Sequence, residues 1–426
     1  MSPTQTWFCA QMGGREHYAI PRALYSAQAL GGLMTDFWAG TLTKGMVELL
    51  PGKLWHSIGA RCHPDIPSNL VESSNLRAFV WEASLRGMAR RGGVKGRYLG
   101  YCEVGRRFAQ AVTRCMKARR SLPENSVFFG YDTCSLEVME HFKQRGVACI
   151  VDQIDPCRVE VEMVQGEHQA WPGWEEHPLD VPDEFFERHI NEWAIADRVV
   201  VNSEFSRKGL MQQGVPGDKI VVIPLGFGLP AGRNGDPSEG TNVLLRIMPK
   251  SFTRENPLRV LFLGQVMLRK GIQYLVEAAK LLQHEPVHFD IVGPIHITNK
   301  AVSSVPPNLV FHGRATRDQI GDWYRRADVF VLPTLSDGFA ITQIEAMANG
   351  LPVIATPNCG AVVSDGVDGF IVPPRDPHLL AHAIHRYLEE PDCLENQHRA
   401  ARQKVGQFSL QRTSRALLQL ACEIQL

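Results

Sequence analysis

"DVFVLPTLSDGFAITQIEAMANGLPVIAT", residues 328–356, is the stretch of sequence that decides the fold. It opens with an apolar run, turns at SDG, continues in a helical pattern and ends in a second apolar run, PVIAT. Near-continuous apolar runs are typical of parallel strands that are buried on both faces. Gly350 suits the left-handed position that ends a helix. The stretch therefore predicts a strand, a helix from about Ala340 to Asn349, and a second strand.

The same alternation continues on both sides of this stretch. In the first half, apolar runs predict strands at 6–11, 126–130, 147–153, 198–203 and 219–226. In the second half they predict strands at 258–264 and 287–293, with helical patterns between them. A tight turn at Gly13 and Gly14 and a helix from about Glu16 to Leu30 follow the first strand. We therefore expect an α/β protein with two doubly wound, Rossmann-like domains that face a central cleft.

Length and composition also favour two domains. A chain of 426 residues exceeds what one compact core usually holds. The sequence PAGRNGDPSEG concentrates loop-forming residues between the two halves. We predict a first domain over residues 1–228, a linker over 229–257 and a second domain over 258–395. Residues 396–426 form a helical pattern and are a candidate to cross back to the first domain.

Charge and cysteine content exclude several classes of protein. The net charge is zero, so the molecule as a whole has no electrostatic reason to bind nucleic acid. Its ten cysteines form no CxxC pair, which favours free thiols in a reducing compartment. The first residues lack the pattern of a secretory signal, and no apolar run approaches 18 residues. We therefore expect a cytoplasmic protein.

Local charge leaves two interpretations open. Residues 77–120 contain twelve basic residues and only two acidic ones, whereas residues 152–192 contain twelve acidic residues and two basic ones. The simpler interpretation is two oppositely charged faces. The other is that the region 77–120 makes peripheral contact with lipid headgroups at the inner face of a membrane, or with an anionic acceptor.

The helix that follows SDG is a candidate anion-binding site. The first N–H groups of a helix lack intrahelical acceptors, and the helix dipole favours negative charge there. We expect the amides from about Phe339 to Thr342 to point beyond the strand ends. Asp337 precedes the first turn and Glu345 follows one turn inside, so both carboxylates border the same space. The alternative is structural, with Asp337 as a helix cap and Glu345 as a partner of the helix dipole.

The stretch GQVMLRKG supplies cations to the same space. Arg269 and Lys270 follow the strand 258–264 and precede a helix. In a parallel sheet the carboxyl ends of the strands border one crevice. The arginine guanidinium can bind two phosphate oxygens at once (bidentate binding), whereas the lysine ammonium acts as a point charge. Basic loop residues are more often simply solvated, but together with the helix start they favour a diphosphate site.

These residues carry a resemblance to a known family. SDGFAITQIEAMANGLPVIAT and DGVDGFIVPPRD, preceded by GQVMLRKG, resemble the second domain of the retaining glycosyltransferases of the GT-B fold, the large family 4, or glycosyl transferases group 1. In that family two carboxylates separated by seven residues mark the nucleotide-sugar site. MGGREHYAIPRAL resembles the family's glycine-rich opening loop, and the likeness is thinnest between Leu33 and Asn191.

The resemblance implies transfer of a hexosyl unit from a nucleotide-diphosphate sugar to a glycan, lipid-linked or small-molecule acceptor, with retention of configuration. Asp337 would contact the sugar and Arg269 and Lys270 the departing diphosphate, which makes these the predicted catalytic residues. The implied donor-binding residues are Gly13, Gly14, Arg314, Gly338, Phe339, Ala340, Ile341, Thr342 and Glu345, with Glu345 on the ribose. The acceptor-side candidates are Arg15, His17, Asp152 and Asp155.

We expect neither a metal nor any other cofactor. The sequence shows no DxD pattern of the kind that a divalent ion needs, and a helix N-terminus with two cations would stabilise a leaving diphosphate. No carboxylate is clearly placed as a nucleophile, so front-face displacement is favoured. The sequence departs from the family at Asp337, where Glu is usual, and at Gln265, where Arg is common. VDQIDP stands where a His often ends a strand.

Other functions fit parts of the sequence. A dinucleotide oxidoreductase is disfavoured because GQVMLRKG lacks the GxGxxG spacing. A sugar-nucleotide epimerase, a phosphorylase, or a non-catalytic module that binds nucleotide-sugar or glycan remain alternatives. Hydrolysis or transfer from a labelled nucleotide-sugar separates an enzyme from a binding module.

Overall fold

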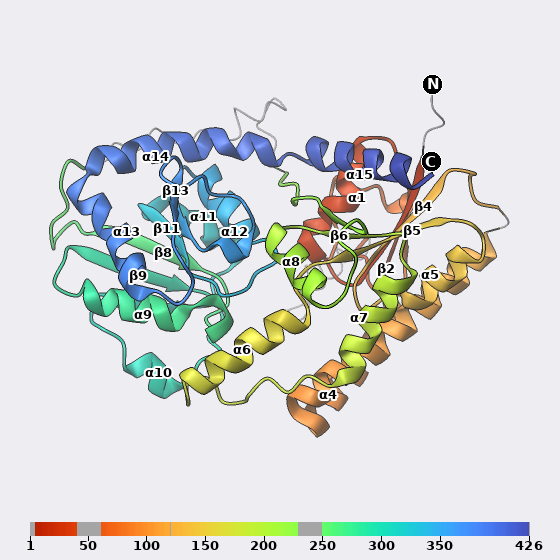
Figure 1. The fold of residues 1–426 in the computed structure, drawn as a ribbon, viewed down its shortest axis with the longest axis horizontal. Helices are drawn as coiled ribbons and strands as arrows, with labels where there is room; N and C mark the ends of the chain where they lie inside the picture. The colour runs from red at the N-terminus through yellow and green to blue at the C-terminus, as the bar shows by residue number, and fades with distance from the viewer. Residues whose placement is uncertain (1–4, 41–60, 120, 229–248, 426) are drawn as a thin grey trace.

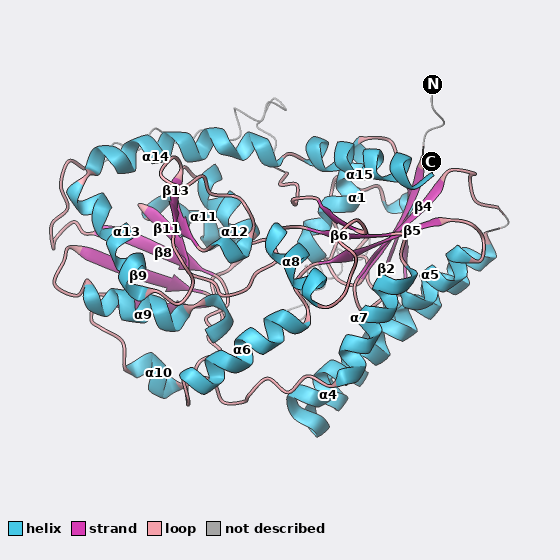
Figure 2. Ribbon diagram, in the orientation of Figure 1, coloured by secondary structure: helices cyan, strands magenta, loops and turns pink. Residues whose placement is uncertain are grey.

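Two parallel β-sheets, each flanked by helices, form the two halves of the molecule in the computed structural model (Figure 1). The structure describes residues 5–40, 61–119, 121–228 and 249–425. Residues 229–248, most of the predicted linker, lie outside the described residues. Figure 2 shows helices on the outer sides of both sheets. The predicted fold class, α/β with two doubly wound domains, is confirmed.

The first sheet has the order β3-β2-β1-β4-β5-β6-β7, and all neighbouring strands are parallel. Its strands are β1 (Thr6–Gln11), β2 (Leu30–Thr35), β3 (Val71–Ser73), β4 (Ser126–Tyr131), β5 (Ala148–Gln153), β6 (Arg198–Val201) and β7 (Ile220–Val222). Its helices are α1 (Ala19–Ser26), α4 (Asn75–Ala118), α5 (Leu136–Lys143), α6 (Arg158–Ala170), α7 (Asp183–Ile195) and α8 (Glu204–Gln212). Every residue of β4 is buried, as expected for a central parallel strand.

The second sheet has the order β10-β9-β8-β11-β12-β13 and is also parallel. Its strands are β8 (Leu258–Leu263), β9 (Val287–Val292), β10 (Leu309–Gly313), β11 (Val329–Leu332), β12 (Val353–Ala355) and β13 (Gly369–Ile371). Its helices are α9 (Ile272–Leu281), α10 (Asn299–Ser303), α11 (Arg317–Arg326), α12 (Ile341–Ala348), α13 (Pro377–Glu389) and α14 (Pro391–Lys404), and the chain continues into α15 (Leu410–Gln425), which packs on the first half. Because β8 and β11 are neighbours, the segments that follow them meet at one edge.

The predicted helix over 16–30 is wrong at both ends. α1 covers only Ala19–Ser26, and β2 already begins at Leu30. Before α1, the short 3-10 turn η1 (Arg15–Tyr18) contains three non-glycine residues with left-handed backbone, Glu16, His17 and Tyr18. Strand β2 and the edge strand β3 were not predicted, because LGGLMT is interrupted by glycines and VES is only three residues long.

The long helix α4 is folded into a hairpin. Gly93, with φ of 57° and ψ of −136°, breaks the helix into arms that cover residues 75–92 and 94–118. A Cβ on Gly96 would lie 2.3 Å from the carbonyl oxygen of Met88, and one on Gly100 would lie 2.7 Å from Leu85. The arms therefore pack face to face. Of the helices described, none is both long and apolar enough to cross a membrane.

Helices α6 and α15 connect the two halves. α15, at the end of the chain, packs against α1 of the first half (Figure 1). The Thr413 hydroxyl donates to the carbonyl oxygen of Pro224 at 3.3 Å. α6 packs on the other half through Glu167, which is 2% exposed. Its carboxylate accepts hydrogen bonds from Gln273 at 2.9 Å and Tyr274 at 2.8 Å.

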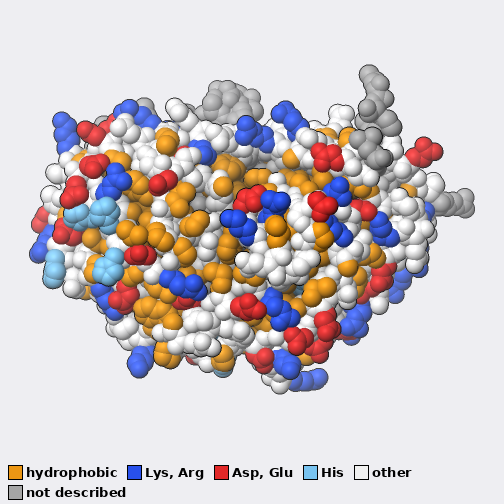
Figure 3. Space-filling view, in the orientation of Figure 1, with side chains coloured by type: hydrophobic (Ala, Val, Ile, Leu, Met, Phe, Trp, Pro, Cys, Tyr) orange, Lys and Arg blue, Asp and Glu red, His pale blue; other side chains and the backbone are white. Residues whose placement is uncertain are grey.

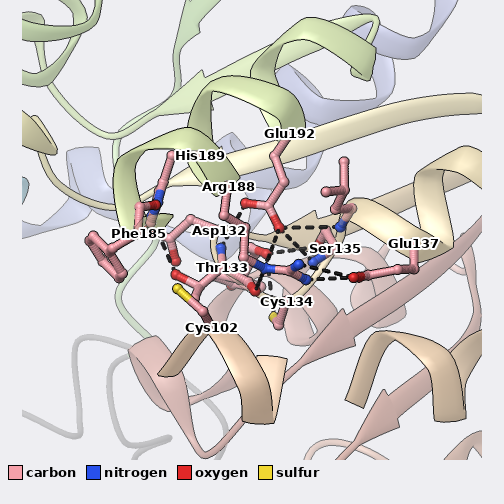
Figure 4. A network of polar contacts seen from close by, with 12 residues as sticks. Cys102, Asp132, Thr133, Cys134, Ser135, Glu137, Phe185, Arg188, His189 and Glu192 are labelled. Atoms are coloured by element: carbon pink, nitrogen blue, oxygen red, sulfur yellow. Dashed lines mark hydrogen bonds and ion pairs between the residues drawn. The ribbon is translucent and has the colours of Figure 1, made fainter. Parts of the chain in front are cut away.

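A buried polar network holds the loop after β4 (Figure 4). Thr133 has a left-handed φ of 69° just before α5. Glu192 of α7, fully buried, accepts from the backbone N–H groups of Thr133, Ser135 and Leu136 at 2.7, 2.9 and 3.2 Å. Arg188 donates to the carbonyl oxygen of Thr133. A carboxylate from another helix thus takes the place of a local cap for α5.

We predict that Glu192→Ala destabilises the first half by roughly 3–5 kcal/mol, because it leaves the buried N–H groups of Thr133, Ser135 and Leu136 without an acceptor. Urea unfolding, followed by circular dichroism, measures the loss in the free energy of unfolding. Glu140→Ala on the exposed side of α5 is the control and should change stability by less than about 0.5 kcal/mol. Equal effects of the two substitutions would contradict the capping role.

Candidate functional site

A pocket of about 560 Å³ lies where the carboxyl ends of β8 and β11 face the first half. Its size is in the range of small-molecule sites. It is lined by His17, Lys270, Ile320, Asp337, Phe339, Ala340, Ile341, Thr342 and Glu345. Seven of the predicted site residues of the second half and one of the first half therefore share one pocket.

The start of α12 opens into this pocket. Ala340 is the N-cap residue and provides no side-chain cap, so Asp337 does not act as one. Ile341 and Thr342 are the first two helical residues, and their N–H groups have no intrahelical acceptor. The amides from Phe339 to Thr342 were predicted to be unpaired and to point into the pocket. This prediction is wrong for Ala340, whose N–H donates to the carbonyl oxygen of Cys359 at 3.2 Å. The pocket thus meets the positive end of an uncapped helix.

Gly338 lies at the contact between the two halves and packs directly against the first half. A Cβ at this position would lie 1.7 Å from the carbonyl oxygen of Ile154 and 2.9 Å from the side-chain oxygen of Asn202. Only glycine allows the turn before α12 to approach the first half this closely. Gly338 is not among the residues that line the pocket.

Lys270 and Asp337 face each other across the pocket and form an ion pair. Their side chains are 13% and 16% exposed. Lys270 ends the 3-10 turn η4 (Leu268–Lys270), and the next residue, Gly271, has φ of 73°. A Cβ on Gly271 would lie 1.9 Å from the carbonyl oxygen of Pro333. Glycine therefore lets this turn pack on the end of β11, which brings the ammonium to the carboxylate.

Glu345 is held by a residue that the sequence did not reveal. The hydroxyl of Tyr324, on α11, donates to the Glu345 carboxylate at 2.9 Å. Burial and the Glu345 charge raise the pKa of Tyr324 well above its usual value, so the hydroxyl stays a donor. The carboxylate is thereby oriented while it still borders the pocket.

Arg269 points to the first half instead of into the pocket. Its guanidinium donates to the backbone oxygen of Ser336 at 2.9 Å and to Glu160 of α6 at 3.3 Å. The Ser336 hydroxyl also donates to Glu160, at 2.7 Å. Burial works to lower the pKa of Arg269, but Glu160 and Asp337 outweigh it and the pKa is raised. Glu160, which sequence reasoning missed, therefore holds this cation near Asp337.

The glycine turn after β1 is fixed from neighbouring strands. Gly13 is left-handed, with φ of 70°, and its N–H donates to Asp36 at 2.8 Å. Arg15 pairs with Asp132, which directly follows β4. Of the predicted residues in this loop, the exposed His17 lines the pocket, whereas Gly13, Gly14 and Arg15 do not. Asp132 was missed, although an acid at the carboxyl end of a parallel strand is a usable signal.

A group of carboxyls lies behind this loop. Tyr131 donates to Glu16 at 3.1 Å. Burial, opposed by Tyr131 and Arg15, raises the pKa of Glu16 to about 7. Burial and then Glu16 raise the pKa of Asp152 well above its usual value. Burial and then Glu160 raise the pKa of Asp155 to about 7. Neither Asp152 nor Asp155 lines the pocket, so of the four acceptor-side candidates only His17 is among its lining residues.

Arg314 belongs to a different pocket. It lines a space of about 390 Å³ with Gly313, His312, Trp323 and others on the far side of α11. Ile320 of the same helix faces the main pocket, so α11 separates the two spaces. Within the described ranges, no group of three or more His, Cys, Asp or Glu side chains is placed to hold a metal ion.

We predict that Glu16→Gln increases the stability of the folded protein, and that the increase depends on pH. The carboxyl ionises near pH 4.5 when unfolded and near pH 7 when folded, so its contribution to stability is full below pH 4.5 and is lost as the pH rises to 7. The substitution removes this loss and keeps an acceptor for Tyr131. Circular dichroism should show a higher Tm than wild type at pH 8 and no gain at pH 4. Glu140→Gln, which is exposed, serves as control, and a lower Tm of Glu16→Gln at pH 8 would refute the assignment.

Comparison with known proteins adds a family match for the second half. Residues 257–390 match the model of the family "Glycosyl transferases group 1". A D-inositol 3-phosphate glycosyltransferase of Streptomyces bingchenggensis is 28% identical over 247 residues, which are 54% of this chain and 53% of that protein. Its counterpart in Xylanimonas cellulosilytica is 30% identical over 209 residues, 46% of this chain and 50% of that protein. The chain thus spans about half the length of the relatives that it matches.

Solved structures match over nearly the whole chain. HepE of Anabaena, solved in complex with UDP-glucose, has a TM-score of 0.59 at 15% identity and covers 98% of this chain and 99% of its own. Sucrose-phosphate synthase of Thermosynechococcus elongatus has a TM-score of 0.59 at 17% identity, with 99% of both chains covered. At these identities the likeness shows the fold. The chain has the GT-B fold, and its residues 257–390 match the group 1 glycosyltransferase family.

Proposed function

We propose that this protein transfers a hexosyl unit from a nucleotide-diphosphate sugar to an acceptor, with retention of anomeric configuration and without a metal. One observation carries the proposal. The uncapped start of α12, the Lys270–Asp337 pair and Glu345 all line one pocket of about 560 Å³. The family match over residues 257–390 supports it, as do relatives that are themselves glycosyltransferases.

The donor is assigned to this pocket by the chemistry of its parts. The N–H groups of Ile341 and Thr342 suit the diphosphate, since helix N-termini bind anions. The Glu345 carboxylate, fixed by Tyr324, suits the ribose hydroxyls. Asp337 suits the hydroxyls of the hexose. HepE, whose complex with UDP-glucose shares this fold, supports a nucleotide-sugar donor.

Stabilisation of the leaving diphosphate is the main catalytic requirement. As the glycosyl–phosphate bond breaks, negative charge collects on the phosphate oxygens, and fixed positive groups are worth most there. Lys270 has three N–H donors, so it can hold Asp337 and a phosphate oxygen together. Arg269 does not line the pocket and is already paired with Glu160 and Ser336, so the proposal assigns the direct contact to Lys270. Among the described residues, the pocket lining contains no carboxylate besides Asp337 and Glu345, which favours front-face displacement over a covalent intermediate.

The acceptor approaches from the first half. His17 is the residue of the first half that lines the pocket. We therefore assign the acceptor hydroxyl to the side of the pocket next to His17. Glycan, lipid-linked and small-molecule acceptors all fit this assignment. All ten cysteines are free thiols, which suits action in a reducing cytoplasm.

We predict that nucleotide-sugars raise the Tm of the wild-type protein, because a ligand that binds only the folded state stabilises it by mass action. A panel of UDP-, GDP- and ADP-sugars in thermal-shift assays identifies the donor. Glu345→Ala should lose most of the shift, and Glu389→Ala, at an exposed acid of α13, should keep it. An unchanged shift in Glu345→Ala would contradict the ribose contact.

We predict that Lys270→Ala lowers kcat by about 10²–10³-fold, as removal of one fixed group that stabilises developing negative charge does elsewhere. Transfer or hydrolysis of the labelled donor measures the rate, and NMR of the first product shows its anomeric configuration. Lys280→Ala on the outer face of α9 is the control. EDTA should leave the rate unchanged. Donor binding without any turnover in the wild type would mean a non-catalytic binding module.

A further inference from the structure

The outer face of the first arm of α4 exposes apolar side chains. Leu76 and Val80 are 86% and 61% exposed, and Phe79, at the border of this face, is 46% exposed and packs edge-on against Phe37. Leu76, Val80 and the exposed Ala83 recur at helical spacing and so form one stripe. On the opposite side of the same arm, Ala78 and Trp81 are only 9% and 6% exposed. The stripe is therefore the outward face of a helix whose inner face is already packed.

Basic side chains flank this stripe. From residue 75 to 97 the chain carries six basic residues and one acid, Glu82. The basic residues are Arg77, Arg86, Arg90, Arg91, Lys95 and Arg97, and all are exposed. Of these six residues, only Arg86 has an ion-pair partner within the described part of the chain, Glu82 at 2.8 Å. Figure 3 shows Lys and Arg side chains at the lower edge of the molecule, where the turn of the α4 hairpin lies in Figure 1.

We propose that this face, residues 75–97, docks on an anionic lipid bilayer. An interfacial helix needs an apolar face that enters the headgroup region and cations beside it that contact acidic lipids, and this arm presents both. A nucleic acid would use the cations but not the stripe. If a second copy of the chain docked through the same face, two surfaces with a net charge of about +5 each would face one another, and their repulsion would be unfavourable.

Docking in this orientation places the first half of the site next to the lipid. Phe79 and Arg86 also line a pocket of about 140 Å³ that reaches Asp36. Asp36 holds the N–H of Gly13 in the turn that precedes His17. The second arm, through Tyr98, lies close enough to Glu160 and Asp155 that their charges act on the Tyr98 hydroxyl. The docked face is thus continuous with the acceptor side of the cleft.

Vesicle flotation of the purified full chain tests the proposal. We expect binding to vesicles of 70% phosphatidylcholine and 30% phosphatidylglycerol and weak binding to phosphatidylcholine alone. Arg90→Glu/Arg91→Glu should reduce binding by roughly 25-fold or more, since each basic residue near an anionic surface contributes about fivefold. Leu76→Ser/Val80→Ser should reduce it by about tenfold even at low salt. Both pairs lie outside the donor pocket, so thermal shifts with nucleotide-sugar should persist.

Matched charge reversal elsewhere is the control. Lys208→Glu/Lys300→Glu changes two exposed lysines away from α4 and should bind vesicles as the wild type does. Circular dichroism confirms that each variant is folded. The proposal is overturned if the wild-type protein does not bind anionic vesicles, or if the control variant loses as much binding as the α4 variants. It is also overturned if Leu76→Ser/Val80→Ser binds as the wild type does, because the binding would then be a general attraction to polyanions.

Discussion

The contact on which the site depends is the packing of Gly271 against the carbonyl oxygen of Pro333. β8 and β11 are neighbours in the second sheet, so the turns that follow them compete for the same space. Only a residue without a Cβ allows η4 to lie directly on the end of β11. Lys270 then meets Asp337, and both face the uncapped start of α12. A cation, a carboxylate and free helix amides come together because one side chain is absent.

The two halves meet through α6, whose carboxylates reach into the second half. Glu167 is almost fully buried and bonds to Gln273 and Tyr274, while Glu160 engages Arg269 and Ser336. A buried carboxylate is costly unless it is paired, so these contacts specify how the halves meet more than they stabilise the fold. They also place Ile154 against Gly338. The position of Arg269 therefore depends on the first half as much as on its own strand.

Much of the fold and part of the site were predictable from local sequence. The apolar runs marked β1, β4, β5 and most strands of the second sheet to within a few residues, because a buried parallel strand has few polar positions. The stretch around Asp337 and Glu345 was readable as strand, turn and helix. The edge strand β3, with three residues, carried too little pattern. The helix over 16–30 was predicted too long, because periodicity does not reveal three left-handed residues in a row.

The sequence by itself determined that the chain forms two doubly wound sheets and that Lys270, Asp337 and Glu345 follow strands of the second one. Those features depend on periodicity and turn chemistry, which act between neighbours in the chain. Only the tertiary structure decided that Tyr324 orients Glu345, that Asp36 and Asp132 fix the loop before His17, and that α4 folds back at Gly93. The hydrogen bonds and the ion pair join residues 21 to 117 positions apart, and no local pattern records which distant groups satisfy a buried charge or an unpaired amide.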